Sequence, residues 1–304
     1  RPGMLTKPDG RRLQATVLFF IGALCAVSTS ADTLETVERR ITASTAFETT
    51  PTLGNDGTTD LVVFTMRPYI NGNFGAGDIW YQPLVGGAPS GMPVQVTSGP
   101  IDDQLNDVSG DYIVYTAFDS VTSYSGAIKL YQISTGTVTT LSTAAIILEP
   151  KIHGNRVVWR EGASGGYMLK YYELNWIGTA LEPNVFAGPI PPTYDVQIGE
   201  RFAVWSELDG NYDVYAYDFA SDVQFPVTTT PGADERNPAT SGDWIVWERD
   251  SVAIEGWNPF TGERISLSNG GGNYNPTIAG NLDIRAGIIG LAESLQPGLR
   301  RIVA

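Results

Sequence analysis

The residues best suited to chemistry in this chain are carboxylates and amides that recur where a repeated strand begins. Two functions fit such a set: recognition of a polar or basic partner, or glycoside hydrolysis by two carboxyl groups at a set separation. Because acidic residues in turns are mostly just solvated, we favour binding over catalysis. The candidate binding residues are Asp102, Asp103, Asn106, Glu149, Asp195, Asp234, Arg236, Asn237 and Asn275.

Other catalytic chemistries have little support in the sequence. The chain holds one histidine, His153, and one cysteine, Cys25. This count excludes zinc sites built on His and Cys ligands. His153 occupies a strand position that other repeats fill with Ser109 or Ser241, so we interpret it as a packing or polar filler residue. The segment 209–213 lacks the full calcium-loop pattern and is predicted to be a tight turn. We therefore expect neither a metal nor a cofactor.

The composition indicates a globular protein rich in turns. The chain has 304 residues, of which 42% are hydrophobic, with 34 Gly and 19 Pro. Its formal net charge is -14 and its isoelectric point about 4.4. Phosphate binding needs clustered Lys and Arg, which this sequence lacks, so a nucleic-acid partner is excluded. The acidity favours solubility, with weak cation binding as a further effect.

The N-terminal residues have the pattern of a secretory signal peptide. A basic segment, residues 7–12, precedes an apolar run at residues 13–27, and small residues follow at 28–31. The run is short for a bilayer span. We predict a leader over residues 1–31, one domain over residues 32–304, and a periplasmic or secreted location. A retained membrane anchor is the alternative.

Internal repeats dominate the remaining sequence. Each unit has an apolar second strand that ends on an aromatic residue, at spacings of 51, 44, 46 and 42 residues. Four short strands per unit at this period are typical of a β-propeller blade. Since each blade buries its two faces only against its neighbours, we interpret the aromatics as inter-blade packing. They are Phe64, Tyr115, Trp159, Trp205 and Trp247.

The ends of the chain set the expected number of blades. Residues 275–280 resemble residues 237–242 and open a sixth unit, with its second strand at 288–292. Residues 36–42 resemble a fourth strand, and we expect them to complete the last blade. Such closure leaves no unpaired sheet edge. The sequence therefore predicts a six-bladed ring closed by an N-terminal strand; a fragment cut short is the competing interpretation.

The repeat Asn-Pro-x-x-x-Gly-x-x-Ile-Val-Trp at residues 237–247 and the strand Asp-Val-Tyr-Ala-Tyr-Asp at 213–218 resemble the TolB-like six-bladed propeller family. The resemblance runs from about residue 50 to the C-terminus and lacks the TolB N-terminal α/β domain. It implies a periplasmic or surface scaffold that binds other proteins, often at the mouth of the central channel.

From these features we expect an exported, monomeric, non-enzymatic propeller. Its partner would be a protein or polysaccharide of the cell envelope, with no nucleic acid and no membrane span after leader cleavage. A carbohydrate-active enzyme of the glycoside hydrolase type is the alternative. Segments 67–77 and 180–192 differ from their counterparts in other units, so we expect loops there that carry recognition.

Overall fold

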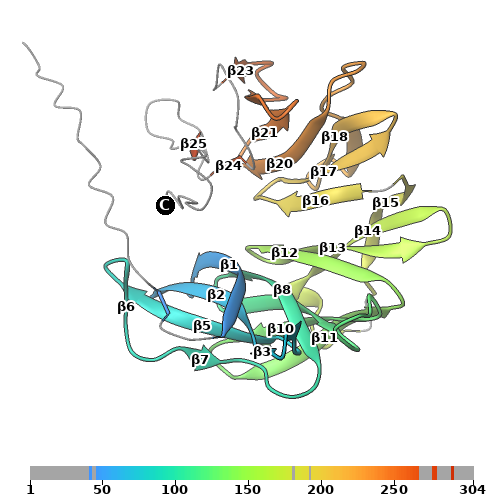
Figure 1. The fold of residues 1–304 in the computed structure, drawn as a ribbon. Coiled ribbons are helices and arrows are strands. Elements are labelled where there is room, and N and C mark those ends of the chain that lie inside the picture. Colours follow the sequence, from blue (N-terminus) through green and yellow to red (C-terminus); the bar gives the residue numbers. More distant parts are fainter. Residues whose placement is uncertain are drawn as a thin grey trace, which may run out of the picture. The chain divides into compact units, whose positions relative to one another are not determined.

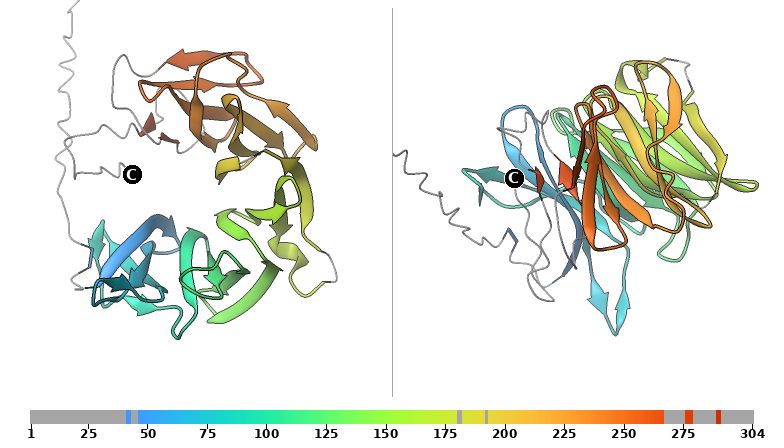
Figure 2. Two further views of the ribbon diagram at one scale, coloured as in Figure 1. Left: turned by 45° about the vertical axis from the view of Figure 1, so that its right-hand side comes forward. Right: turned by 90° about the horizontal axis from the view of Figure 1, so that it is seen from above.

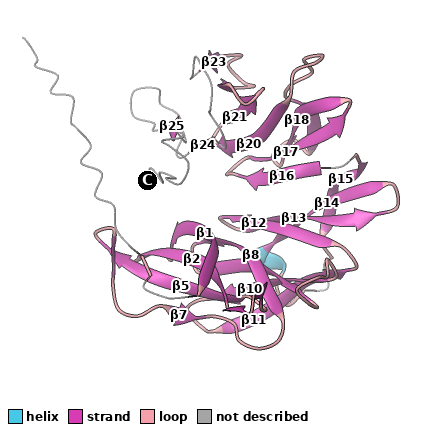
Figure 3. Cartoon of the chain, viewed as in Figure 1, coloured by secondary structure: helices cyan, strands magenta, loops and turns pink. Residues whose placement is uncertain are grey.

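The computed structural model describes residues 41–42, 46–179, 182–191, 193–266, 276–278 and 289–290. The chain divides into two units, Arg1–Arg39 and Arg40–Ala304, and every described residue belongs to the second. These residues form antiparallel strands, with a single 3-10 turn, η1 (Leu174–Trp176) (Figure 3). The all-β prediction is confirmed.

Five antiparallel sheets follow one another along the chain, and we number them as blades one to five (Figure 1). Blade one contains β1 (Phe47–Asn55), β2 (Asp60–Arg67) and β5 (Asp78–Val85), with the short β6 (Ala88–Pro89) and β7 (Val94–Gln95) both paired to β5. Blade two contains β8 (Asp102–Ser109), β9 (Tyr112–Phe118), β10 (Gly126–Gln132) and β11 (Thr137–Ala144). Blade three contains β12 (Ile147–His153), β13 (Arg156–Ala163), β14 (Gly166–Glu173) and β15 (Asn184–Ile190), and blade four contains β16 (Thr193–Ile198), β17 (Phe202–Asp209), β18 (Asn211–Asp218) and β19 (Val223–Pro226). Blade five contains β20 (Glu235–Ser241), β21 (Trp244–Arg249), β22 (Ala253–Trp257) and β23 (Arg264–Ser266).

The first strands of neighbouring blades lie side by side: β8 is adjacent to β1 and β12, and β16 is adjacent to β12 and β20. Each is the terminal strand of its own sheet. The sheets therefore turn about a common axis with their first strands innermost, as the two views of Figure 2 show. This arrangement is a β-propeller, as the repeats predicted.

The predicted number of blades was wrong for the described residues, which form five blades rather than six. Of the sixth unit they include only β24 (Thr277–Ile278) paired with β25 (Ile289–Gly290), beside β20. The pairing matches the predicted first and second strands. This unit has no aromatic in its second strand, so it lacks the large side chain that fills the space between the other blades.

The core consists of apolar clusters between neighbouring blades. One joins Val114 and Ile128 of blade two to Trp159 of blade three. The next joins Val158 of blade three to Trp205 of blade four, and similar clusters fill the other interfaces. Trp159, Trp205 and the equivalent Trp247 are fully buried. The interpretation of the repeated aromatics as inter-blade packing is therefore confirmed for Tyr115, Trp159, Trp205 and Trp247. Phe64 instead packs on the face of blade one that points away from blade two.

The two segments expected to be irregular loops contain strands. Within residues 67–77, β3 (Tyr69–Ile70) pairs with β4 (Asn73–Phe74) through an Asn-Gly turn whose residues both have positive φ. Asn-Gly favours this hairpin turn because both residues tolerate the left-handed region. Most of residues 180–192 forms β15, the fourth strand of blade three. Its alternating pattern is weak because Gly and Pro interrupt it.

The proposed closing strand at residues 36–42 lies almost wholly outside the described residues. Ile41 is described, and it packs against Val62, Phe64 and Leu84 on the face of blade one that points away from blade two. The predicted leader, residues 1–31, also lies outside the described residues. In the part of the chain that the structure describes, no helix is long and apolar enough to span a bilayer.

Candidate functional site

Each innermost strand carries a β-bulge at the same place, which the sequence analysis missed. The register to the second strand shifts between Thr49 and Thr52 in blade one, and at the equivalent step in the other four. The first bulge residue has positive φ in every blade, which is uncommon for residues other than glycine. These five residues are Thr50, Leu105, Glu149, Asp195 and Asn237. Three of the predicted site residues are thus equivalent positions within a strand, rather than turn residues before it.

The bulge residues face the second strand of their own blade, at the residue that follows the repeated aromatic. In blade one the Thr50 and Thr65 hydroxyls lie 3.0 Å apart. In blade three Arg160 Nη2 lies 2.9 Å from Glu149 Oε1. In blade five Asn237 donates to Glu248 at 2.8 Å. We call these five bulge residues and their second-strand neighbours the bulge ring.

Asp195 is the exception in the bulge ring. Its neighbour on the second strand is Ser206, whose hydroxyl is directed to the Tyr194 carbonyl instead. Among the described residues, no group donates a hydrogen bond to the Asp195 carboxylate or forms an ion pair with it. Burial, followed by the nearby Glu149 carboxylate, raises the pKa of Asp195, and the Arg160 and Arg236 guanidinium groups oppose this rise without reversing it. This carboxylate is therefore an open acceptor in a partly desolvated place.

Arginine and tyrosine side chains form a continuous series across blades three to five. The Arg160 guanidinium lies over the rings of Tyr167, at 5.2 Å, and Tyr194, at 5.6 Å. Tyr194 meets Tyr212 edge to face at 5.8 Å. Arg236 stacks on Tyr212 at 3.9 Å. We call these five residues the arginine–tyrosine belt. Contacts of this kind between cations and aromatic rings hold planar groups in fixed orientations.

One face of the propeller carries the starts of the first strands and the turns between second and third strands. We call it the mouth face, and the belt lies toward it. Tyr167, Tyr194, Tyr212 and Arg236 are each the second residue of a strand that begins there. Tyr194 is 40% exposed and Arg160 is buried. The belt thus combines a solvent-accessible ring with a buried, fixed cation beneath it.

Asp234 supports the outer end of the belt. Its carboxylate accepts from Arg236 Nη2 at 2.7 Å and from the Tyr212 N–H at 3.1 Å. The Tyr212 hydrogen bond and the Arg236 guanidinium hold the pKa of Asp234 below its usual value, with burial opposing them. Asp234 is therefore ionised at neutral pH and fixes Arg236 against the Tyr212 ring.

The predicted site residues of blade two do not lie with this group. Asp102 is fully buried and accepts from the Gly77 N–H at 2.8 Å, from Gln104 and from Arg67. Asn106 is buried and bonds to Thr50, Thr52 and Thr65 of blade one. Asp103 is also buried, at the interface between blades one and two. Asn275 lies outside the described residues.

The structure therefore assembles Glu149, Asp195, Asp234, Arg236 and Asn237 around blades three to five, and places the other described candidates in the packing between blades one and two. The tyrosines and Arg160 were absent from the prediction. Arg160 follows the repeated Trp159, where other units hold Ser, Thr or Glu, and this departure was the available signal.

A second aromatic surface lies on the mouth face of blade one. Tyr69, Ile70 and Phe74 of the β3–β4 hairpin are 59%, 63% and 44% exposed. The Phe74 ring contacts both Phe47 and Tyr69 at 4.9 Å between ring centroids. Exposed aromatic clusters of this kind mark interaction surfaces more often than isolated exposed residues do.

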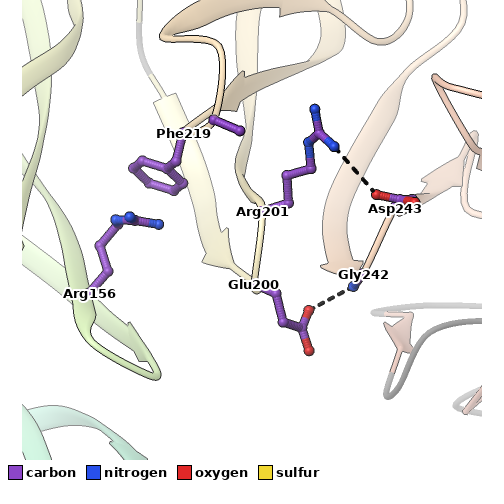
Figure 4. A pocket seen from close by; sticks show the side chains of 7 residues that line it. Arg156, Glu200, Arg201, Phe219, Gly242 and Asp243 are labelled. Carbon is purple, nitrogen blue, oxygen red and sulfur yellow. Dashed lines mark hydrogen bonds and ion pairs between the residues drawn. The ribbon is translucent and has the colours of Figure 1, made fainter.

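The face opposite the mouth carries an open cavity of about 420 Å³ between blades three, four and five (Figure 4). Arg156 stacks on Phe219 at 3.8 Å and is held by Glu173. Arg201 is held by Asp218. The Glu200 carboxylate accepts from the Gly242 N–H of the next blade at 2.7 Å. Because other residues of the fold already pair with these charged groups, we interpret the groups as structural contacts that join neighbouring blades.

The described residues contain no cluster of three His, Cys, Asp or Glu side chains able to hold a metal. The letters Gly-x-Ser-x-Gly occur at residues 162–166, but Ser164 and Gly165 form the two-residue turn between β13 and β14. A nucleophile elbow requires a strand-to-helix turn. His153 ends β12, half exposed, 3.6 Å from Glu200 of the next blade.

No protein-family profile matches the chain, and no curated protein matches it in sequence. Solved structures do match its fold. TolB from Acinetobacter baumannii superposes with a TM-score of 0.52 at 14% identity, over 78% of this chain and 58% of that one. A protein from Agrobacterium tumefaciens that carries the provisional name TolB gives 0.50 at 14% identity, over 77% and 86%. A prolyl endopeptidase structure gives 0.55 at 10% identity, over 77% of this chain and 38% of that one.

At these identities the matches show the fold alone. They support a TolB-like propeller fold for residues that the structure describes. The chain spans 58% of the length of the Acinetobacter TolB structure.

Proposed function

We propose that this protein is an exported, non-enzymatic scaffold that binds another protein or a polymer of the cell envelope at its mouth face. The arginine–tyrosine belt carries this proposal. Tyr and Arg are enriched at the centres of protein interfaces, where they supply most of the binding energy. Because the fold already holds the Arg160 and Tyr212 side chains in place, little side-chain entropy is lost when a partner binds there.

The open Asp195 carboxylate and the exposed β3–β4 hairpin support the same face as the binding surface. Asp195 offers a charged acceptor beside the exposed Tyr194 ring. The hairpin supplies apolar area on another blade. A partner that contacts both Asp195 and the hairpin would bury aromatic rings and donate a hydrogen bond or a positive charge to the carboxylate. The buried rings provide affinity, and the polar contact fixes the orientation of the partner.

Export is part of the proposal and rests on the signal-peptide pattern at residues 1–31. The TolB structures among the matches support the fold and do not bear on export. Mass spectrometry of the mature N-terminus from expressing cells tests this part directly, with cleavage after residues 28–31 expected.

The glycoside hydrolase alternative finds less support in the site. It requires two carboxyl groups free to act as acid and as base or nucleophile. Arg160 holds Glu149, and Arg236 and the Tyr212 N–H hold Asp234. Of these three predicted carboxylates, Asp195 alone lacks such a partner among the described residues. A screen of the purified protein against envelope and storage glycans tests this alternative, and release of sugar would overturn the scaffold proposal.

The binding proposal is tested by affinity capture from an envelope extract of the source cells. The baits are the wild-type protein, Tyr194→Ala at the mouth face and Phe260→Ala at the opposite face. Both residues are exposed aromatics, so the two variants remove similar area. We expect a protein or glycan that wild type and Phe260→Ala retain and that Tyr194→Ala retains at least tenfold less. Equal retention by both variants would contradict the proposal.

A further inference from the structure

Two of the interfaces between blades contain the same arrangement of two carboxyl groups and a threonine. The first group is Asp78 of β5, Thr97 and Asp103 of β8. The second is Asp213 of β18, Thr228 and Glu235 of β20. In both, the aspartate lies in the third strand of one blade, and the second acid lies in the first strand of the next blade, two residues before the bulge residue.

The threonines make the same contacts in the two places. The Ile79 N–H donates to Thr97 Oγ1 at 2.9 Å, and the Val214 N–H donates to Thr228 Oγ1 at 2.8 Å. In turn, the Thr97 N–H donates to the Ile79 carbonyl at 3.3 Å, and the Thr228 N–H donates to the Val214 carbonyl at 3.2 Å. The repeated geometry places each hydroxyl against both acids of its group.

Both pairs contain a buried carboxyl oxygen without a hydrogen-bond partner. Asp103 and Glu235 are buried, and the unpartnered atoms are Asp78 Oδ1 and Glu235 Oε2. The Glu235 and Asp213 carboxyls lie within hydrogen-bonding reach of each other. These two carboxylates cannot both ionise at little cost, whereas one proton shared between them satisfies both. Asp78 and Asp103 meet through the Thr97 hydroxyl, and their charges repel each other when both are ionised.

Lys129 lowers the pKa of Asp103 and Arg249 lowers the pKa of Glu235, but burial outweighs both effects. Near Asp103 lie Asp102, which Arg67 and the Gly77 N–H already hold, the Tyr115 phenol, and Lys129, whose ammonium donates to Thr140. Near Glu235 lies Arg249, which is paired with Glu255 and Asp250. The remaining interfaces serve as internal controls: the equivalent positions are Ala127 and Ile147 between blades two and three, and Met168 and Thr193 between blades three and four.

We propose that these two carboxyl pairs are pH-sensitive latches, which hold blades one and two and blades four and five together in mild acid and loosen at neutral pH. Both latched interfaces extend to the mouth face. The latch proposal does not depend on which partner binds at that face.

The direction of the pH effect follows from burial. Burial raises the pKa of Asp103 to about 6. It also raises the pKa of Glu235, Asp78 and Asp213. The folded state therefore holds these protons to higher pH than the unfolded chain does, and stability falls as pH rises from about 4 through about 6. From Asp103 alone, the unfolding equilibrium constant increases about tenfold between about pH 5 and about pH 7.5.

The test compares urea unfolding of the purified protein at these two pH values. The double variant Asp103→Asn with Glu235→Gln keeps the shape and hydrogen-bonding capacity of the pairs and removes their titration. We expect its unfolding constant to change at least tenfold less between the two pH values than the wild-type constant changes. The matched control, Asp119→Asn, alters an exposed carboxylate and should keep the wild-type pH dependence. Equal pH dependence of wild type and double variant would overturn the proposal.

Hydrogen exchange of the wild-type protein provides a second readout if the variants fail to fold. After correction for the pH dependence of intrinsic exchange, we expect amides of β8 and β20 to lose protection relative to those of β12 as pH rises from about 5 to about 7.5. Parallel changes in all three strands would overturn the latch proposal.

Discussion

The Arg160 guanidinium is fixed by Glu149, a residue that the bulge of the neighbouring innermost strand holds in the left-handed region. Arg160 is buried, so its contacts with Glu149 and with the Thr193 carbonyl determine where its charge lies beneath Tyr194. The bulge thereby links backbone geometry at the channel to side-chain geometry at the mouth face. A non-glycine residue in the left-handed region is strained and persists only where the surrounding fold holds it in place. Residues of this kind cluster at functional sites.

Arg160→Met should destabilise the fold by about 1–3 kcal/mol, since it leaves the Glu149 carboxylate without its cation in a partly buried place. Arg236→Met is the matched control: Arg236 and Asp234 are both about two-fifths exposed, so this change should cost less than about 1 kcal/mol. Urea unfolding of the two variants measures the difference. Equal costs would show that Arg160 does not depend on its buried pairing.

Trp205→Phe should cost about 1–3 kcal/mol more than Trp247→Phe, because it removes a donor to a buried carboxylate. Trp205 Nε1 donates to Glu207 at 2.6 Å, and Glu207 is buried. Trp247 is equally buried, but its Nε1 has no partner among the described residues. Both substitutions leave similar cavities, so comparison of their unfolding free energies isolates the hydrogen bond. If Trp247→Phe proves the more costly, the hydrogen bond is not the source of the difference.

Asn106→Leu should destabilise the protein by about 2–4 kcal/mol through loss of the hydrogen bonds that join blade two to blade one. The Asn106 amide donates to the Thr50 carbonyl and to Thr52, and accepts from Thr50 and Thr65. Asn73→Leu, at an exposed position in the β3–β4 hairpin, should change stability by less than about 0.5 kcal/mol. Thermal unfolding of both variants provides the comparison, and similar midpoints would contradict the assigned role of Asn106.

Asp218 should contribute stability that is lost in acid, opposite in sign to the carboxyl latches. Burial alone would raise the pKa of Asp218, but hydrogen bonds from Arg201, the Ala220 N–H and Ser221 outweigh it, and the pKa lies below its usual value. The stabilisation is therefore complete above the unfolded pKa of about 4 and disappears as pH falls through the lower folded value. Asp218→Asn should reduce stability at neutral pH and lessen its further loss below about pH 4. Acid titration followed by circular dichroism measures this, and an unchanged acid transition would refute it.

The sequence was sufficient to predict the propeller because its packing signals repeat. Trp159, Trp205 and Trp247 occupy equivalent positions within the second strands, and a hydrophobic residue at a fixed period needs a neighbouring sheet to cover it. The bulges could not be read from hydrophobic alternation, since residues such as Leu105 and Asp195 share no side-chain chemistry. Only their backbone conformation is common. The sequence offers one sign of the bulges: a proline follows the bulge residue in two blades, as Glu149-Pro and as Asn237-Pro.

The candidate site was harder to predict than the fold because it depends on contacts between blades. Asp103 and Asp195 look alike in the sequence, yet one lies in a carboxyl pair between two sheets and the other beside the exposed Tyr194. Which acids share a face follows from the register of each strand. A single-residue change of register reverses the face of every side chain, and the sequence pattern alone did not give that accuracy.

The claim that the mouth face is the working surface is tested most directly by site-specific photocrosslinking in the source cells. A photoreactive phenylalanine analogue would replace Tyr194 at the mouth face in one strain and Phe260 at the opposite face in another. We predict a discrete crosslinked species from position 194 and none from position 260. Crosslinks from position 260 alone, or the same species at equal yield from both positions, would contradict the account.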